Sequence, residues 1–395
     1  MIQENEQQQA APQGEQQAQQ AEPQGEQQAE PQGDARQAES QGEQPQQGDP
    51  AVDMTQTARE VQEADEAAEV ERFGTKLIAP AKVNLFLDIG PRRADGYHEA
   101  ISIMHALTLH DILYMDAKSA AEYAQLHPAE DVERLGLAEG CGLVVDLNCV
   151  VGDARQELDL DLGDDPEDNT VVRAARALAR RIGREEDEVL TLRLEKHIPT
   201  KGGMGGGSSD AAAALVGCAS LWGLEADDPR IEEVARAIGA DVPFFLHGGC
   251  ACLTGAGDVF DHALKPMGDY LVLVKPSCGV PTAEAYRAFD EAPTSIDAAD
   301  RELALQTARA ANVPLRNNLA SASESLLPEL VEVREWLAER LPADAILLAG
   351  SGATTFARCS SFSEAGRIAS DARAKGWWAR TTTFGPVKAA IVPAD

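Results

Sequence analysis

The sequence is poor in positive charge. Its 395 residues include 34 lysines and arginines against 66 aspartates and glutamates, which gives a formal net charge of −32. An acidic excess of this size argues against binding to nucleic acid or to an anionic membrane, because both are themselves negative. It still allows a local pocket for an anionic ligand. We therefore expect no nucleic-acid partner and no membrane partner.

Long apolar runs and paired cysteines are also missing. No apolar stretch approaches the roughly 20 residues that span a bilayer, and the N-terminus lacks a basic and apolar signal sequence. The seven cysteines are an odd number without a C-x-x-C pair, which suits reduced thiols better than a disulfide framework or a zinc site. Cys250 and Cys252 are interpreted as packing residues of a strand. We expect a cytoplasmic protein without a metal-ligand set of its own.

Residues 1–72 lack the apolar side chains that a core needs. The unit Pro-Gln-Gly followed by Glu or Asp recurs at Pro12, Pro23 and Pro31, among Gln, Ala and Glu. The segment holds 17 acidic and three basic residues. Because little apolar surface offsets the entropy of ordering, the composition predicts a disordered Gln/Glu-rich acidic tail. The tail is either a solvated spacer or an interaction segment.

A glycine-rich stretch, Ile198–Leu215, is the most informative part of the sequence. Five of the six positions 202–207 are glycine. They follow a strand-like alternation at Thr191–Glu195 and precede an alanine-rich helical run that starts with Ser208–Asp210. Strand, glycine loop and helix start form an arrangement in which backbone N–H groups reach a phosphate at the positive end of a helix dipole. A flexible linker and a structural C-cap turn are the alternatives.

Two common nucleotide-binding motifs do not fit this loop. The Lys-Ser/Thr ending of a Walker A loop is absent between Gly202 and Ser209. The third glycine of the dinucleotide fingerprint is absent as well. The residues alone therefore predict a phosphate cradle of another kind.

The rest of the chain alternates strand and helix patterns irregularly, which predicts an α+β fold with mostly antiparallel sheets. An Asp-Gly turn at 92–98 follows the first strand. Residues 117–168 are acidic and irregular, and we expect a surface excursion around one strand. Strands are expected near 77–89, 101–109, 112–115, 143–147, 191–195, 270–274 and 389–392, and a strand with a turn at 345–356. Helices are expected near 169–183, 208–220, 229–239, 282–291, 296–311, 316–326, 328–340 and 362–375.

Four further features could carry chemistry, and each has an ordinary structural explanation. Lys82 lies at the start of an apolar strand, where a lysine usually reaches toward solvent. Asp241 precedes an apolar run, where an aspartate often caps a helix. Tyr97 and His98 follow a turn, and residues 350–352 form a second tight glycine turn. None of the four is decisive alone.

Together these segments resemble the GHMP small-molecule kinases. The resemblance covers about residues 73–395, in the family's order. Residues 1–72 have no counterpart, and the stretch 117–168 looks longer than is usual. The motifs that carry the resemblance are Pro80–Leu87, Arg93–His98, Pro199–Ala212, Gly239–Phe245 and Gly350–Thr354.

The resemblance implies a two-domain GHMP kinase fold. A ribosomal protein S5 domain 2-like N-terminal domain that binds ATP would span residues 73–260, and a C-terminal α+β domain residues 261–395. The active site would lie in the cleft between them. The implied reaction is transfer of the ATP γ-phosphoryl group to an alcohol, with Mg²⁺ held mainly through the phosphates. The implied acceptor is a small cytidine diphosphate derivative, and a monomer or weak homodimer is expected.

The resemblance also implies the site residues. Lys82 and Asp241 are the implied catalytic pair, with Asp241 as the general base and Lys82 stabilising negative charge. A homoserine-type or mevalonate-type kinase and a non-catalytic nucleotide sensor remain the alternatives. The implied ATP-binding residues are Pro199, Thr200, Lys201, Gly202, Gly203, Met204, Gly205, Gly206, Gly207, Ser208 and Ser209, with Asn169 and Lys196 near adenine; the implied substrate-binding residues are Asn84, Tyr97, His98, Thr282 and Tyr286.

Overall fold

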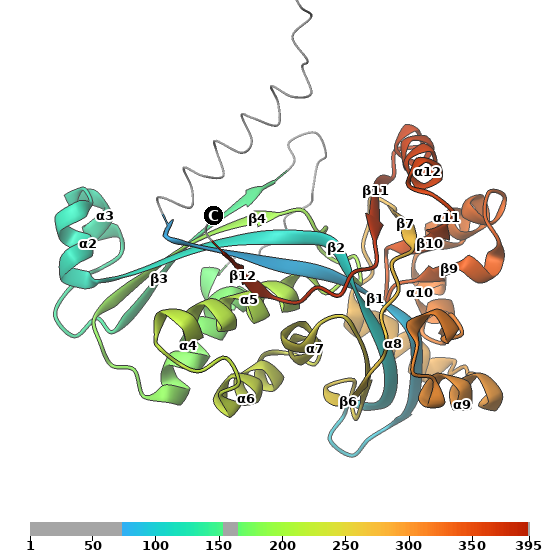
Figure 1. Cartoon of the computed structure of the whole chain (residues 1–395), viewed down its shortest axis with the longest axis horizontal. Coiled ribbons are helices and arrows are strands. Elements are labelled where there is room, and N and C mark those ends of the chain that lie inside the picture. The colour runs from blue at the N-terminus through green and yellow to red at the C-terminus, as the bar shows by residue number, and fades with distance from the viewer. Residues whose placement is uncertain (1–72, 153–164, 394–395) are drawn as a thin grey trace, which may run out of the picture. The chain divides into compact units, whose positions relative to one another are not determined.

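The computed structural model describes residues 73–152 and 165–393 as an α+β fold (Figure 1). Within these residues, no helix is long and apolar enough to cross a membrane. The tail predicted for residues 1–72 lies outside the described residues. The strands are β1 (Thr75–Arg92), β2 (His98–Ser119), β3 (Leu143–Val151), β4 (Glu188–Lys196), β5 (Cys250–Thr254), β6 (Val259–Ala263), β7 (Tyr270–Lys275), β8 (Arg316–Asn317), β9 (Ile346–Leu348), β10 (Thr355–Cys359), β11 (Trp378–Thr383) and β12 (Ala390–Val392). The helices are α2 (Ala120–Leu126), α3 (Ala129–Arg134), α4 (Thr170–Ile182), α5 (Gly206–Leu221), α6 (Pro229–Ile238), α7 (Val242–His247), α8 (Thr282–Glu291), α9 (Ala298–Gln306), α10 (Ala320–Leu326), α11 (Glu329–Ala338) and α12 (Phe362–Ala374).

Two β-sheets organise these elements. The larger sheet has eight strands in the order β12-β1-β2-β4-β3, with β5, β6 and β8 paired off this path. The smaller sheet has the order β11-β7-β10-β9 and is antiparallel throughout. In the larger sheet only β3 with β4 and β8 with β1 are parallel, so the expectation of mostly antiparallel sheets is confirmed for the described residues. The predicted domain boundary after residue 260 stays a prediction.

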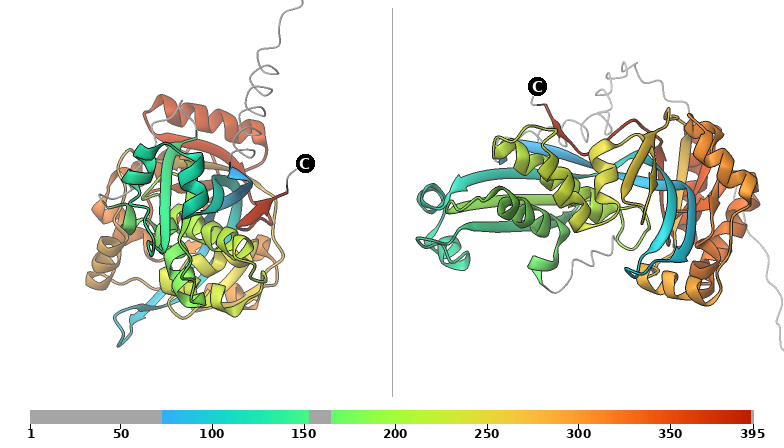
Figure 2. Two further views of the ribbon diagram at one scale, coloured as in Figure 1. Left: turned by 90° about the vertical axis from the view of Figure 1, so that its left-hand side faces the viewer. Right: turned by 90° about the horizontal axis from the view of Figure 1, so that it is seen from below.

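A long hairpin of β1 and β2 connects the two halves of the fold. Register shifts after Pro80 and after Asn84 let the hairpin bend. At one end it packs on α5, and at the other its Leu87 and Ile89 join a buried cluster with residues of α8 and α10. Figure 2 shows the hairpin running between these two groups of helices. The hairpin therefore brings side chains from both halves to the same place.

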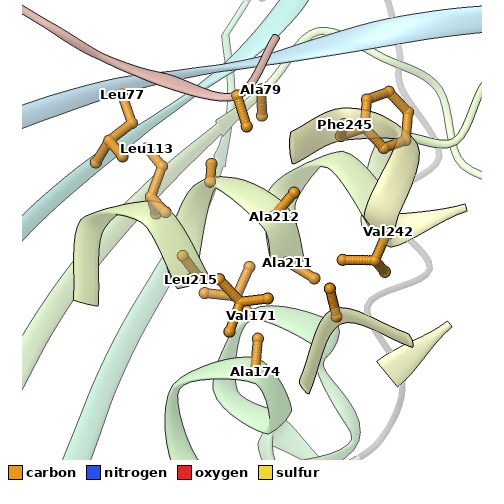
Figure 3. Packing of buried hydrophobic residues seen from close by; sticks show 14 of the residues in the cluster. Leu77, Ala79, Leu113, Val171, Ala174, Ala211, Ala212, Leu215, Val242 and Phe245 are labelled. Carbon is orange, nitrogen blue, oxygen red and sulfur yellow. The ribbon is translucent and has the colours of Figure 1, made fainter. Parts of the chain in front are cut away.

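Helix α5 lies in the centre of the main core. Its residues Ala211–Leu215 are all buried, which suits a helix covered on several sides rather than an amphipathic surface helix. Figure 3 shows Ala211, Ala212 and Leu215 between the strands, which contribute Leu77 and Leu113, and the helices α4 and α7. The small alanine side chains let the helix approach the sheet closely. The start of α5 is thereby fixed against β1 and β2.

The strands predicted at 101–109 and 112–115 are one strand, β2, so the separation was wrong. The polar pair His110-Asp111 stays within the strand, where Asp111 pairs with Ala79 of β1. Asp111 Oδ1 accepts the N–H groups of His197 (2.5 Å) and Ile198 (2.8 Å). Because this buried carboxylate is satisfied by the neighbouring chain, the strand continues through it.

Two other expectations need correction. The described part of the excursion 117–168 is more regular than predicted, because it contains α2 and α3 as well as β3, which pairs with β4. The helix predicted at 316–326 begins only at Ala320, because Arg316 and Asn317 form β8 beside β1. Both departures depend on partners far away in the sequence.

Because His105 of β2 is buried as a neutral ring, we expect the protein to lose stability in acid. Its Nδ1 donates to Ala106 O and its Nε2 accepts from Met267 N, which is the arrangement of a neutral ring. Burial lowers the pKa of His105 from 6.5 to about 4. The unfolded chain therefore binds a proton in this pH window and the native protein does not, so stability is lost as pH falls from 6.5 toward 4, by up to about 3 kcal/mol.

The test is chemical denaturation of wild type and of His105→Gln at pH 7 and pH 4. We expect the difference in unfolding free energy between these pH values to be smaller in the variant by about 3 kcal/mol. An equal acid sensitivity of the two proteins would show that His105 is not responsible.

Candidate active site

A cavity of about 570 Å³ lies where the glycine loop meets the β1–β2 hairpin, α8 and the turn at 350–351. The charged residues of its described lining are three lysines and one aspartate, Lys82, Lys196, Lys201 and Asp241. This local excess of positive charge contrasts with the net charge of −32 of the whole chain. The cavity can therefore attract an anionic ligand that the rest of the surface repels.

Lys82 and Asp241 form an ion pair in the cavity wall. Lys82 Nζ lies 3.3 Å from Asp241 Oδ2, and the two side chains are 5% and 30% exposed. The same ammonium donates to Asn84 Oδ1 (2.8 Å), and Asn84 Nδ2 donates to Ser102 Oγ (2.9 Å). Asp241 stands at the N-cap of α7 but makes no side-chain capping bond, so its carboxylate is available to the cavity. Each charge balances the other, which makes their burial tolerable.

The glycine loop ends in a helix start that differs from the prediction. The helix α5 begins at Gly206, not at Ser208, and its N-cap is Gly205 with φ +70°. A Cβ on Gly205 would lie 2.7 Å from the ring of Phe245 and 3.2 Å from Lys82 Cγ. Only glycine combines this backbone conformation with this close approach. Gly206, Gly207 and Ser208, the first residues of α5, line the cavity, so the helix begins at an open space, as an anion-binding helix start requires.

The turn at 350–354 packs against the glycine loop and supports its backbone. Thr354 N donates to Gly202 O (3.1 Å), and a Cβ on Gly203 would lie 2.0 Å from Ala349 O. Asn317 Nδ2 donates to Gly350 O (2.8 Å), which ties the turn to β8. The two glycine segments found in the sequence are therefore one structural unit.

An aromatic group lies at the α8 end of the site. Tyr286 lines the cavity, and burial together with the charge of Asp241 raises the pKa of Tyr286 to about 12. The ring of His98 lies 5.4 Å from that of Tyr286, and its Nε2 is 3.2 Å from Asp290 Oδ1. Tyr97 is 65% exposed. Neither Tyr97 nor His98 belongs to the cavity lining.

Most of the predicted site residues converge on this cavity. Those outside its lining are Asn169, Ser209, Tyr97 and His98. Asn169 caps α4 by accepting the N–H of Val171 (2.9 Å), and Ser209 is buried inside α5. Those in the lining are Lys82, Asn84, Lys196, Asp241, Thr282, Tyr286 and every residue from Pro199 to Ser208.

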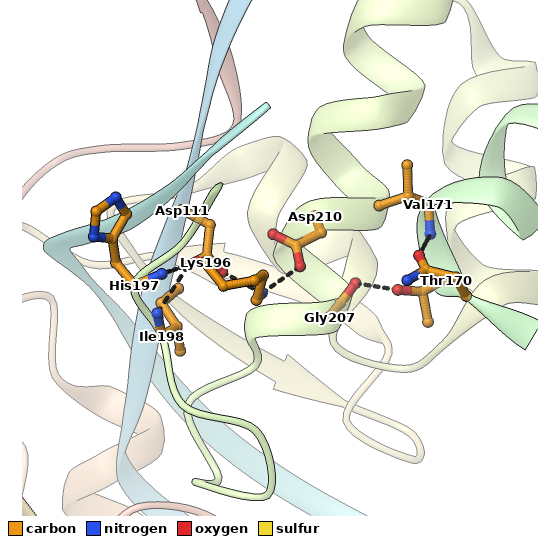
Figure 4. A network of polar contacts seen from close by, with 9 residues as sticks. Asp111, Thr170, Val171, Lys196, His197, Ile198, Gly207 and Asp210 are labelled. Atoms are coloured by element: carbon orange, nitrogen blue, oxygen red, sulfur yellow. Dashed lines mark hydrogen bonds and ion pairs between the residues drawn. The ribbon is translucent and has the colours of Figure 1, made fainter. Parts of the chain in front are cut away.

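Lys196 lies at the back of the lining and is held from two sides (Figure 4). Its Nζ pairs with Asp111 of β2 and with Asp210 of α5. Neither aspartate is assigned a role at the site from the sequence alone. Asp210 was visible in the glycine motif as a possible cap, but nothing near Asp111 in the sequence indicates a partner on β4.

The described residues offer one group of His, Cys and acidic side chains within metal-ligand distance, Cys252, Asp261 and His262. None of the three lines the cavity. The single carboxylate of the lining, Asp241, is already paired with Lys82. The cavity therefore fits a cation that a bound polyanion brings with it better than a cation held by a protein cage.

Comparisons with known proteins agree with this geometry. A model of the GHMP kinases N terminal domain matches residues 169–249, and a model of the GHMP kinases C terminal matches residues 296–376. The 4-diphosphocytidyl-2-C-methyl-D-erythritol kinase of Salinispora arenicola is 34% identical over 79% of this chain and 92% of its own. The enzyme of the same name from Pelotomaculum thermopropionicum is 35% identical over 74% of this chain and 91% of its own. A crystal structure of 4-(cytidine 5'-diphospho)-2C-methyl-D-erythritol kinase superposes with a TM-score of 0.57 at 30% identity, over 78% of this chain and all of that one.

Fold and site define a small-molecule kinase of the GHMP class, with ATP as the phosphoryl donor. Within that class, the chain belongs to the family of the 4-diphosphocytidyl-2-C-methyl-D-erythritol kinases.

Because Phe245 and Lys82 approach Gly205 closely, a side chain at this position should weaken nucleotide binding. We expect Gly205→Ala to raise the KM for ATP by about tenfold or more, because the added methyl group must move Phe245 or Lys82. Gly223 is a matched control, since its φ of +69° is nearly the same but a Cβ there meets nothing within 4 Å. Gly223→Ala should cost roughly 1–2 kcal/mol of stability and leave the KM unchanged. Equal KM values for the two variants would contradict the steric explanation.

Proposed function

We propose that this kinase transfers the γ-phosphoryl group of ATP to the 2-hydroxyl of 4-diphosphocytidyl-2-C-methyl-D-erythritol. The products are the 2-phosphate and ADP, in the non-mevalonate route to isopentenyl diphosphate. The observation that carries the proposal is the pairing of Lys82 with Asp241 in the wall of the cavity that the glycine loop closes. The names of the similar enzymes supply the acceptor.

The glycine loop and the start of α5 hold the triphosphate. Their backbone N–H groups need no charge to bind phosphate oxygens, and the helix dipole adds attraction. Lys201, whose backbone has φ +51°, lines the same end of the cavity. Mg²⁺ would be held mainly through the phosphates, and when bound it neutralises part of their charge.

Asp241 accepts the proton of the acceptor hydroxyl, or aligns that hydroxyl for attack on the γ-phosphorus. Lys82, which lies beside this carboxylate, stabilises the negative charge on the transferring group. Asn84 Oδ1 accepts a hydrogen bond from Lys82 Nζ and so fixes the lysine. Asn84 Nδ2 in turn donates to Ser102 Oγ, which fixes the amide. The pair is therefore oriented before the substrate arrives.

The cytidine end of the acceptor lies toward Tyr286, where an aromatic face can stack on the base. His98, beside Tyr286, would read an edge of the base, and Tyr97 would cover the other face after closing toward it. Thr282, which exchanges a hydrogen bond with Ser351 (3.0 Å), borders the same end. This aromatic end disfavours homoserine or mevalonate as acceptor, and the Lys82–Asp241 pair disfavours a mere nucleotide sensor.

Loss of either member of the ion pair should strongly lower the turnover rate without unfolding the enzyme. We expect Asp241→Asn and Lys82→Met each to lower kcat by about 10²-fold or more. The double variant should lose little beyond the worse single variant, because the two groups act together. The measurement is ATP-dependent phosphorylation of the proposed acceptor.

Lys265→Met and Asp261→Asn are controls for charge changes, since both residues are exposed and lie outside the cavity lining. They should keep wild-type kcat. Activity within a few fold of wild type in Asp241→Asn would remove the assigned roles.

The acceptor assignment is tested by a substrate panel with 4-diphosphocytidyl-2-C-methyl-D-erythritol, homoserine and mevalonate. Only the first should be phosphorylated at a useful rate. Tyr286→Leu should raise the KM for this acceptor by about tenfold, because it removes the stacking of one aromatic ring on the base. The KM for ATP should stay unchanged. Phe362→Leu, which changes an exposed aromatic on α12, is the control. Preference for another alcohol would replace the proposed acceptor while keeping the kinase assignment.

A further inference from the structure

A buried charge cluster lies directly behind the phosphate end of the cavity. Lys196 Nζ is 2.5 Å from Asp210 Oδ2 and also pairs with Asp111. The side chains of Lys196, Asp111 and Asp210 are 5%, 0% and 4% exposed. Lys196 Nζ also lies only 3.4 Å from where a Cβ on Gly206 would be, at the first residue of α5. The cluster is thus in contact with the helix start that holds the triphosphate.

The charges of Lys196, Asp111 and Asp210 do not sum to zero when all three groups are ionised. Asp111 is satisfied as a carboxylate, because Oδ1 accepts two backbone N–H groups and Oδ2 faces Lys196. Asp210 Oδ1, in contrast, is buried without a hydrogen-bond partner among the described residues. Two carboxylates against one ammonium leave a net negative charge, which is costly in the interior. A proton on Asp210 removes this charge.

Among the described residues, the groups around the cluster do not supply a second cation at neutral pH. His197, which follows β4, interacts with the charge of Asp111, but burial lowers the pKa of its ring from 6.5, so the ring is neutral. β2 contributes Asp111, β4 contributes Lys196, and β3 contributes Cys149. Burial, with the charge of Asp210, raises the pKa of Cys149 to about 11, so its thiol is neutral at neutral pH. Thr170 of α4, which donates to Gly207 O (2.8 Å), cannot titrate (Figure 4). The proton balance of the cluster therefore depends on Asp210.

We propose that Asp210 is a proton-linked positioning residue for the nucleotide, protonated when the triphosphate is bound and opposing that binding when it is ionised. The inference rests on the proposed function only in placing a polyanion on the glycine loop. An ionised Asp210 gives the cluster a negative charge beneath the N-terminus of α5 and opposes the attraction of the helix dipole. The proton comes from solvent as the nucleotide binds, and it returns to solvent when the nucleotide leaves.

The sign of the pH dependence follows from linkage. Burial, opposed by the charge of Lys196, raises the pKa of Asp210 to about 8. A bound polyanion raises that pKa further, so the complex holds a proton that the free enzyme has lost above pH 8. Each pH unit between the pKa values of the free and bound states weakens binding by up to about tenfold.

The first experiment measures the Kd of Mg–ATP by titration calorimetry from pH 7 to pH 9.5, without any acceptor. Wild type should bind about tenfold more weakly at the upper end, and Asp210→Asn should bind with a nearly constant Kd. Glu188→Gln is the matched control, because Glu188 is a buried acid on β4, the strand that carries Lys196, and it is paired with Arg184 (2.7 Å) and lies outside the cavity lining. It should behave as wild type.

A constant Kd in wild type would overturn the proposal. So would a pH dependence that survives in Asp210→Asn or is lost in Glu188→Gln.

The second experiment needs no variant and covers the case in which Asp210→Asn does not fold. Binding enthalpies of Mg–ATP to wild type at pH 8.5 are compared in buffers of different ionisation enthalpy. We expect uptake of a substantial fraction of one proton, and no uptake would overturn the proposal. Because both experiments omit the acceptor, an error in the proposed acceptor would leave their outcome unchanged.

Discussion

The site depends on the contact between two pieces of backbone that are far apart in the chain. The N–H of Thr354 donates to the carbonyl of Gly202, and Gly203 approaches Ala349 so closely that no side chain fits between them. This contact joins the loop that precedes α5 to the turn that precedes β10, and so closes the cavity on one side. A phosphate cradle made of backbone must be held by neighbours, because glycine itself gives the loop no rigidity. The turn supplies that support.

A second constraint is electrostatic. The chain is strongly acidic, yet a kinase has to bring together anionic ligands. The cavity meets this need with three lysines, of which Lys82 and Lys196 are buried and each paired with carboxylates. A buried ammonium without such a partner would tend to lose its proton. Each buried lysine therefore reaches the cavity together with a carboxylate partner, Asp241 for Lys82, and Asp111 and Asp210 for Lys196.

Local sequence signals predicted the parts of the fold whose causes are local. The periodic helices α4, α6 and α12, the strands β4 and β7 and the glycine loop were recognisable because their side-chain patterns match their own geometry. The pair of Lys82 and Asp241 was identified only through the family resemblance, since each alone suits a snorkelling lysine or a helix cap. The start of α5 was misplaced because Ser208–Asp210 has strong capping propensity. The close packing of Gly205 against Phe245, which allows the earlier start, is a tertiary effect.

What could not be predicted depends on partners across the fold. Arg316 and Asn317 form a strand because β1 lies beside them, and Asn317 then holds Gly350. Asp111 stays within β2 because the chain after β4 satisfies its carboxylate. In each case the sequence near the residue favours another structure, and the deciding hydrogen bond comes from a segment whose position only the folded chain defines.

In the proposed assignment, the phosphate end and the acceptor end of the cavity are built in different ways. The phosphate end consists largely of backbone, from Pro199 to Gly207, and backbone N–H groups bind any phosphate chain. The acceptor end consists of side chains, with Asn84 from the hairpin and Thr282 and Tyr286 from α8. Side chains can be exchanged without disturbing the glycine loop, so the same phosphoryl-transfer site can serve different alcohols. The proposed assignment therefore places selectivity for the acceptor where the β1–β2 hairpin meets α8, and not in the glycine loop.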